Sequence, residues 1–238
     1  MAEKTVRSAV VLAAGRGTRM GEITSEVPKP MLRVQGKPML EHVLDRLALA
    51  GMERFLIVVG YRREIVEEHF RDWRLPVEFR LQDPVNGTGS AARLGREFTA
   101  GEPFLLTFGD IICEPEAYSA CARVLQDNPA AGAVLGVKWV DDPFQGAAVY
   151  EKDARMYNVI EKPPKGTSTT HWNSAGLYAM RPVVFPYLDR LEPSPRNEYE
   201  LTSIFEMMLA DNVELRIAAI EGSWRDVGRP EDLAALNG

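Results

Sequence analysis

The chain has 238 residues, of which 45% are hydrophobic and 26% charged, and its formal net charge is −6 at pH 7. This composition is typical of a globular protein with a sizeable core, and the acidic balance argues against a nucleic-acid surface, which usually carries a basic excess. No apolar stretch approaches the roughly 20 residues that cross a bilayer, and two cysteines without a CxxC pair exclude a disulfide framework or zinc site, so we expect a cytoplasmic protein without membrane or nucleic-acid partners.

The first apolar run, Ala9–Leu12, is short and β-branched, which predicts a central parallel strand buried on both faces. It leads into a loop with Gly15 and Gly17, and Arg19 and Lys29 follow. Glycines can take positive φ and lack a Cβ, so the backbone N–H groups of such a loop can approach an anion closely. An arginine fork and a lysine stiffened by a proline on each side would face the same polyanion. The alternative is a plain glycine turn with two surface cations.

Three familiar kinds of N-terminal segment do not fit this loop. A Walker loop needs Lys-Ser/Thr after its last glycine, where this chain has Met20–Glu22. A dinucleotide fingerprint, and with it a dehydrogenase, needs a third glycine one place earlier and an acid after the next strand, but Phe55–Val59 is followed by Gly60. A signal peptide would use Lys4 and Arg7 before an apolar core, which the glycines interrupt too soon.

Strands and helices alternate through the first half of the chain, which argues for a parallel sheet with right-handed crossovers. The hydrophobic spacing places His69 on the apolar side of its helix, so we expect it in the core rather than as a ligand. The expected elements are helix 38–50, strand 55–59, helix 65–70, strand 77–81, a loop feeding a helix over 87–98, strand 104–108 and helix 117–125.

The second half has strand-like runs without long helices between them, which predicts antiparallel pairing beside the first sheet. Residues 163–170 form a polar loop. The expected elements are strands 133–140, 147–150, 156–160 and 176–180, helices 182–191 and 201–210, and a last strand over 213–220.

Two acids stand where a sheet could present them. Asp110 follows a buried strand and Gly109, at the carboxyl edge where open α/β folds bind ligands, and Asp226 lies in a second glycine-bounded turn. A hard cation that accompanies phosphates takes oxygen ligands, usually from one or two carboxylates. A turn or helix cap is the alternative for each acid alone. Two such acids together with a phosphate loop favour a metal site.

In this order, the segments resemble those of the sugar-1-phosphate nucleotidyltransferases over nearly the whole chain. Leu12–Met20 with Pro28–Pro30 is similar to the signature loop of that family, and Gln82 with Gly87–Ala91 to its base-reading segment. Gly109–Asp110 resembles its magnesium carboxylate, and the sugar-pocket and second-metal segments resemble Gly146, 161–163, 173–178 and 224–228. The resemblance implies an α/β, Rossmann-like three-layer fold of GT-A type with a mixed, mainly parallel sheet and a small antiparallel sugar-binding part. It also implies a single nucleotidyltransferase domain over residues 1–238, with a nucleotide half of about 1–127 and a sugar-phosphate half of about 128–238.

The resemblance also assigns expected roles to residues of this chain. Arg19 and Lys29 would be catalytic, and Asp110 and Asp226 would hold Mg²⁺. The nucleotide would be bound by Leu12, Ala13, Ala14, Gly15, Gly17, Thr18, Gln82, Gly87 and Thr88, and the sugar phosphate by Gly146, Glu161, Lys162 and Asn173. The amide of Gln82 could accept from N3–H of uracil or thymine and donate to the adjacent carbonyl.

The implied reaction moves a nucleotidyl group, UMP from UTP, to a sugar 1-phosphate and releases pyrophosphate. Thymidylyl or guanylyl transfer to a hexose 1-phosphate, and a non-catalytic regulator on the same fold, are the alternatives, and a homo-oligomer stays open. Ser203 and Arg229 depart from the pattern common in relatives, so the sugar is not fixed. No hexapeptide repeat follows Asp226, so we expect no second activity.

Overall fold

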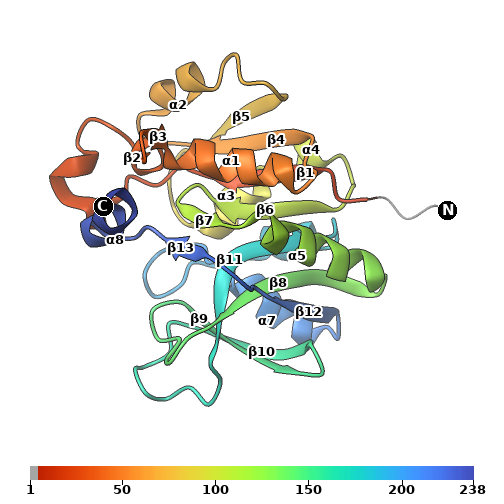
Figure 1. Ribbon diagram of the computed structural model, residues 1–238. Coiled ribbons are helices and arrows are strands. Elements are labelled where there is room, and N and C mark those ends of the chain that lie inside the picture. The colour runs from red at the N-terminus through yellow and green to blue at the C-terminus, as the bar shows by residue number, and fades with distance from the viewer. Residues whose placement is uncertain (1–4) are drawn as a thin grey trace.

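A nine-stranded mixed sheet runs through the centre of the computed structural model, which describes residues 5–238 (Figure 1). Its strand order is β5-β4-β1-β6-β11-β8-β12-β10-β9. The strands are β1 (Ser8–Leu12), β4 (Arg54–Val59), β5 (Val77–Leu81), β6 (Phe104–Phe108), β8 (Ala131–Trp139), β9 (Ala147–Lys152), β10 (Arg155–Glu161), β11 (Trp172–Met180) and β12 (Glu214–Ala219).

The N-terminal part of the sheet is parallel, as the sequence predicts. β1 pairs in parallel with both β4 and β6, and β4 pairs in parallel with β5. Every residue of β1 is buried, which confirms its central position. Because the carboxyl ends of parallel strands meet at one edge, the chain segments that follow β1, β5 and β6 come together there.

The second half extends the same sheet instead of forming a separate one. β11 pairs antiparallel with β6 on one side and β8 on the other, and β9 and β10 form an antiparallel pair. β12 pairs in parallel with β8. Because β9 also pairs with β11, the strands at this end of the sheet curve toward one another. The antiparallel pairing of β9, β10 and β11 is confirmed, and the division near residue 127 stays a prediction.

Helices cover both faces of the sheet and give the three layers predicted. Alternate residues of β1 point to opposite faces: Val11 packs in one core with α1 (Met39–Leu49) and α5 (Pro115–Asp127), and Val10 packs in the other. The second core includes residues of α3 (Thr88–Arg93), α4 (Arg96–Thr99), α6 (Val184–Asp189) and α7 (Ser203–Ala210). No helix within residues 5–238 combines the length and apolarity needed to span a membrane.

Several short elements have no sequence periodicity and were not predicted. They are the 3₁₀ helices η1 (Thr18–Thr24) and η2 (Lys29–Met31), the strands β2 (Arg33–Val34) and β3 (Lys37–Pro38), the pair β7 (Ile111–Cys113) and β13 (Trp224–Asp226), and the C-terminal helix α8 (Pro230–Asn237). The strands of two or three residues are too short for a periodicity to emerge, and α8 buries none of its residues, so it lacks an apolar face that a pattern could reveal. Two of them, η2 and β7–β13, position the site described below.

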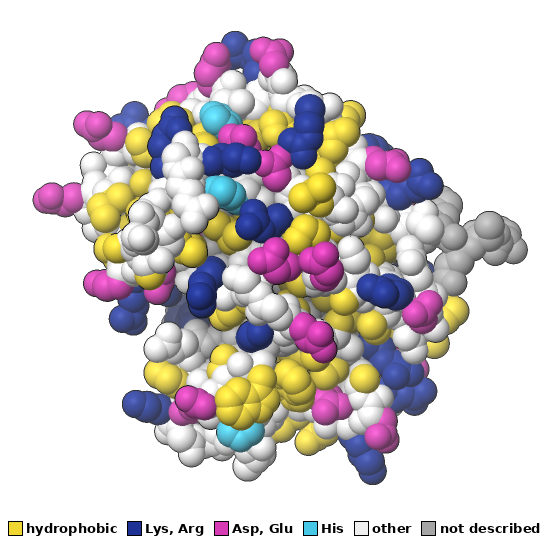
Figure 2. All heavy atoms as spheres, viewed as in Figure 1, with side chains coloured by type: hydrophobic (Ala, Val, Ile, Leu, Met, Phe, Trp, Pro, Cys, Tyr) yellow, Lys and Arg dark blue, Asp and Glu magenta, His cyan; other side chains and the backbone are white. Residues whose placement is uncertain are grey.

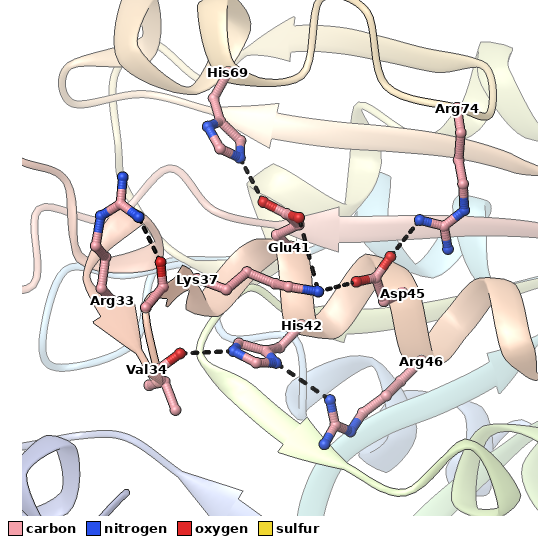
Figure 3. A network of polar contacts seen from close by, with 10 residues as sticks. Arg33, Val34, Lys37, Glu41, His42, Asp45, Arg46, His69 and Arg74 are labelled. Carbon is pink, nitrogen blue, oxygen red and sulfur yellow. Dashed lines mark hydrogen bonds and ion pairs between the residues drawn. The ribbon is translucent and has the colours of Figure 1, made fainter. Parts of the chain in front are cut away.

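The prediction that His69 lies in the core is wrong. Its side chain is 32% exposed, and its Nε2 lies 2.7 Å from Oε2 of Glu41 on α1 (Figure 3). Glu41 belongs to a polar network in which Lys37 contacts Asp45, which in turn contacts Arg74. α2 (Arg63–His69) buries only Val66, so its apolar face is too narrow to take the histidine into the core. The histidine instead helps join α2 to α1.

Candidate active site

A cleft of about 880 Å³ runs along the carboxyl edge of the parallel strands and continues into the second half of the chain. All the predicted site residues except Thr18 line it, although they come from segments far apart in the sequence. Thr18 is exposed at the start of η1 and lies outside the lining. A second groove of about 670 Å³, between η2 and α2, contains none of the predicted residues. The larger cleft is therefore the candidate active site.

The glycine loop is shaped by its packing on Lys29. Gly17 has φ +73°, and a Cβ added there would lie 2.7 Å from Cβ of Lys29, so both the backbone and the space require glycine. Gly15 does not take positive φ, and a Cβ there would meet nothing within 4 Å. The left-handed conformation expected of both glycines is thus found only at Gly17. Within residues 5–238, the backbone N–H groups of residues 15–17 donate no hydrogen bond, which leaves them available to an anion.

The two predicted cations lie on the same side of the cleft as the two predicted carboxylates. Lys29 begins η2 between its flanking prolines, is only 6% exposed, and forms an ion pair with Asp110. Arg19 approaches Asp226 across Gly228, where an added Cβ would lie 3.6 Å from Nη1 of Arg19 and 3.8 Å from Oδ1 of Asp226. The structure therefore brings these four side chains together, and their roles stay predictions.

The short β7–β13 pair brings the two carboxylates together. Asp226 pairs with Ile111, next to Asp110, and Val227 N–H donates to the carbonyl of Asp110 over 3.1 Å. Burial raises the pKa of the Asp226 carboxyl, the charge of Asp110 raises it further, and the nearby Lys29 and Arg19 lower it. Two neighbouring carboxylates repel each other unless a cation lies between or beside them.

The carboxylates of Asp110 and Asp226 fit a magnesium ion that is coordinated partly by the protein and partly by the phosphates of a substrate. Within the described residues, no group of three or more His, Cys, Asp or Glu side chains converges on one point. Mg²⁺ prefers oxygen ligands and is usually held by one or two carboxylates, with substrate phosphates and water completing its shell. Asp110 and Asp226 supply such a pair beside a loop suited to phosphates. These residues do not provide the four protein ligands that hold a structural zinc ion.

Gln82 is buried in the cleft, but its amide is partly used by the protein. Its Nε2 donates to the carbonyl of Gly87 and to Oγ of Ser90, each over 2.8 Å. Both amide hydrogens are therefore occupied, and the expectation that Gln82 also donates to a base is wrong. Only its Oε1 remains to accept a hydrogen bond from a ligand.

Gly87, in the loop that follows Gln82, packs closely against another segment of the chain. Its φ is +125°, and a Cβ there would lie 2.5 Å from backbone atoms of Tyr199. Residues 86–89 are joined to residues 199–201 by hydrogen bonds, including Tyr199 N–H to Asn86 O and Leu201 N–H to Oγ1 of Thr88. Close packing of these two chain segments therefore requires glycine at position 87.

Replacing Gly87 by Ala is expected to lower the free energy of unfolding by about 1–3 kcal/mol, because positive φ and the Tyr199 backbone both oppose a Cβ. Denaturant unfolding measures this. Gly15→Ala is the matched control, since its Cβ would meet open space, and its stability should stay within about 0.5 kcal/mol of the parent. Equal stability of the two variants would contradict the packing described here.

The far end of the cleft collects the predicted sugar-phosphate residues. Gly146 lies against Asn173, whose Oδ1 would clash with an added Cβ, and the carbonyl of Gly146 accepts from Lys162 N–H over 2.7 Å. Oε2 of Glu161 accepts from Oγ1 of Thr202 over 3.0 Å, and burial raises the pKa of the Glu161 carboxyl. Sequence reasoning missed several residues that line or border this end, and their only signal is proximity to the predicted motifs: Asp142, Arg196, Glu200 and Thr202.

Comparison with known proteins agrees with this geometry. The sequence profile of the family described as Nucleotidyl transferase matches residues 8–238. The chain belongs to this family. A UTP–glucose-1-phosphate uridylyltransferase of Haloferax volcanii, AglF, is 35% identical to this nucleotidyl transferase over 228 residues, which are 94% of the chain and 92% of the relative. The predicted membership of the sugar-1-phosphate nucleotidyltransferases is confirmed.

Other similar proteins differ from this chain in length or only share its fold. The bifunctional protein GlmU of Methanococcus maripaludis strain S2 is 33% identical over 230 residues, which are 96% of this chain but 53% of that protein. The chain thus spans about half the length of GlmU relatives of this kind. The solved structure of a UDP-glucose pyrophosphorylase complexed with UDP-glucose matches with a TM-score of 0.89 and 20% identity, covering 98% of this chain and 97% of that one. This likeness confirms the predicted Rossmann-like fold.

Proposed function

We propose that this protein transfers UMP from UTP to a sugar 1-phosphate, forming a UDP-sugar and pyrophosphate. The observation that carries the proposal is a single cleft that joins a glycine loop, two cations, two carboxylates and a buried acceptor pocket. The glycine loop and Gln82 would suit the nucleotide, and the region around Gly146 and Asn173 would suit the sugar phosphate. Such an arrangement favours a reaction between two bound phosphates.

In the proposed reaction, an oxygen of the sugar 1-phosphate attacks the α-phosphorus of UTP. The bond between that phosphorus and the oxygen bridging to the β-phosphorus breaks, and pyrophosphate leaves. Because the attacking phosphate is already ionised, no side chain has to remove a proton. The protein contributes positioning and neutralisation of charge.

The charged residues divide this work by position. Arg19 and the free N–H groups of the glycine loop would bind the phosphates that leave, and Lys29 would lie near the α-phosphate. Lys162, held at φ +44° at the sugar end, would neutralise the incoming phosphate. Mg²⁺ held by Asp110 and Asp226 would supply positive charge to both substrates' phosphates when bound.

The direct test is release of pyrophosphate from UTP and Mg²⁺ in the presence of a panel of sugar 1-phosphates. No release with any sugar 1-phosphate and any nucleoside triphosphate would refute nucleotidyl transfer. That result would favour a non-catalytic regulator on this fold. Against a regulator, the cleft keeps both cations, Arg19 and Lys29, and both carboxylates, Asp110 and Asp226. The face in Figure 2 shows acidic and basic side chains intermingled without a continuous basic patch, in keeping with small-molecule substrates.

The proposed choice of base rests on the one free acceptor of Gln82. Uracil and thymine present N3–H, which Oε1 of Gln82 can accept, whereas N3 of cytosine is itself an acceptor. A buried polar group left unpaired costs about 1–3 kcal/mol, which corresponds to about 5–150-fold discrimination. Guanine also presents a ring N–H, so GTP is the main competitor to this proposal.

We expect UTP to be used best, dTTP second and CTP poorly when five nucleotides compete at equal concentration, ATP and GTP included. Gln82→Ala should flatten the preference between UTP and CTP, because the acceptor is lost. Ser90→Ala is the control: it removes a partner of the Gln82 amide nitrogen but leaves Oε1 in place. A clear preference for GTP would refute uridylyl transfer and leave the reaction type standing.

A further inference from the structure

β5 forms one end of the nine-stranded sheet, away from the strands of the second half (Figure 1). It pairs with β4, and within residues 5–238 no strand pairs with its opposite side. The side chains of Glu78 and Arg80 are 44% and 40% exposed, and Leu81 at the end of the strand is 44% exposed. An open strand edge presents unpaired backbone groups that can pair with a strand of another chain.

The hydrogen bonds to β4 show which backbone groups of β5 point outward. The carbonyl of Pro76 accepts from Phe55 N–H over 3.0 Å, and Gln82 N–H donates to the carbonyl of Val59 over 2.8 Å. Even-numbered residues in this part of the chain therefore bond to β4. Because backbone groups alternate in direction along a strand, the N–H and C=O groups of residues 77, 79 and 81 point away from the sheet.

These outward groups fit a second copy of the same strand. In an antiparallel pair centred on Phe79, the backbone of Phe79 would bond to that of its copy, and Val77 would bond to Leu81 of the copy. Glu78 would then lie opposite Arg80 of the copy, at the positions where antiparallel strands bring side chains closest. A pair centred on residue 78 would place two glutamates opposite each other, and one centred on residue 80 two arginines. The charges therefore select the register centred on Phe79.

The side chains on both faces of β5 suit this pairing. Val77 and Phe79 are partly buried against the core that includes α1, so a second copy would continue that apolar face. On the other face, Glu78 lies 3.4 Å from its own Arg80 and 3.7 Å from Arg54. Nη1 of Arg80 also donates to the outward carbonyl of Phe79 over 3.1 Å. Exposed contacts of this kind contribute little to stability, so the guanidinium can turn toward Glu78 of a second copy.

We infer that β5 is a self-association surface, through which two copies of this chain pair edge to edge about a two-fold axis and join their sheets. The partner is a second copy because a strand with an acid at its second position and a base at its fourth is complementary to itself when reversed. No residue of β5 lines the cleft, so this self-association does not depend on the proposed reaction.

Sedimentation velocity over a range of protein concentrations measures the monomer–dimer equilibrium, and the parent should form a dimer. Glu78→Arg and Arg80→Glu should each raise the dissociation constant of the dimer by about tenfold or more, because each places like charges opposite one another twice. A mixture of the two variants should dimerise within about threefold of the parent, since each introduced charge then faces its opposite on the other chain.

Lys152→Glu is the matched control, because this exposed residue lies on β9 at the other end of the sheet, and it should dimerise like the parent. Circular dichroism and thermal unfolding report whether the variants are folded. In the parent, amide hydrogen exchange over residues 77–81 should slow in the dimer, because the outward N–H groups then have acceptors. The inference would be overturned by a parent that stays monomeric, by a dimer without this protection, or by folded variants that dimerise like the parent on their own or stay monomeric when mixed.

Discussion

Replacing Lys29 by Met is expected to lower turnover by about two orders of magnitude or more, because a preorganised charge beside a reacting phosphate is lost. Met keeps the apolar stem that packs on Gly17 and removes only the ammonium. Lys29 is 6% exposed and paired with Asp110, so thermal unfolding must accompany the kinetics to confirm that the variant is folded. Steady-state pyrophosphate release then gives kcat.

The same loop offers a matched pair of arginines. Arg19→Ala should lose about as much activity as the lysine variant, since Arg19 lines the cleft near Asp226. Arg16→Ala should change turnover little, because that guanidinium lies outside the lining, 5.2 Å from the ring centroid of Tyr61. A folded Lys29→Met or Arg19→Ala variant with near-normal turnover would place the glycine loop outside the active site.

The sequence predicted those parts of the fold whose pattern is local. Ala9–Leu12 and Phe55–Val59 are apolar runs that only a doubly covered strand can bury, and both are central strands. The strand pairing across the second half depends on contacts between distant segments, so the parallel pairing of β12 with β8 was not predictable from either strand alone. His69 was misplaced because periodicity gives the side of a helix, while the depth of burial depends on its neighbours, here Glu41.

For the candidate site, the sequence predicted which residues lie in the cleft better than it predicted what each of them contacts. Nearly all the residues that the motifs predicted line the cleft, because glycines, paired acids and flanked cations are costly unless something requires them. The neighbour that makes each glycine necessary was not predictable. A Cβ at position 87 would collide with the backbone of Tyr199, and one at position 17 with the side chain of Lys29. Gln82 has its amide nitrogen committed to Gly87 and Ser90, a fact that only the folded chain reveals.

Asp110→Asn and Asp226→Asn are both expected to raise the Mg²⁺ concentration needed for half-maximal activity by about tenfold or more, because an amide keeps the shape of the side chain and removes the charge that binds a hard cation. The two variants should differ at saturating Mg²⁺. Asp110 also pairs with Lys29, so Asp110→Asn disturbs the lysine and should keep a lower kcat, whereas Asp226→Asn should recover much of its activity.

The measurement is a Mg²⁺ titration of pyrophosphate release, together with calorimetric binding of Mg²⁺ in the presence of UTP, which reports on the metal without turnover. Asp127→Asn, an exposed acid at the end of α5 and away from the cleft, is the control and should match the parent. Full activity in excess EDTA would refute a metal at this site. If only Asp226→Asn behaves like the control, Asp110 alone holds the ion and water completes the coordination shell. The repulsion between the two carboxylates would then have to be relieved by Lys29 and Arg19, the cations that lie beside them.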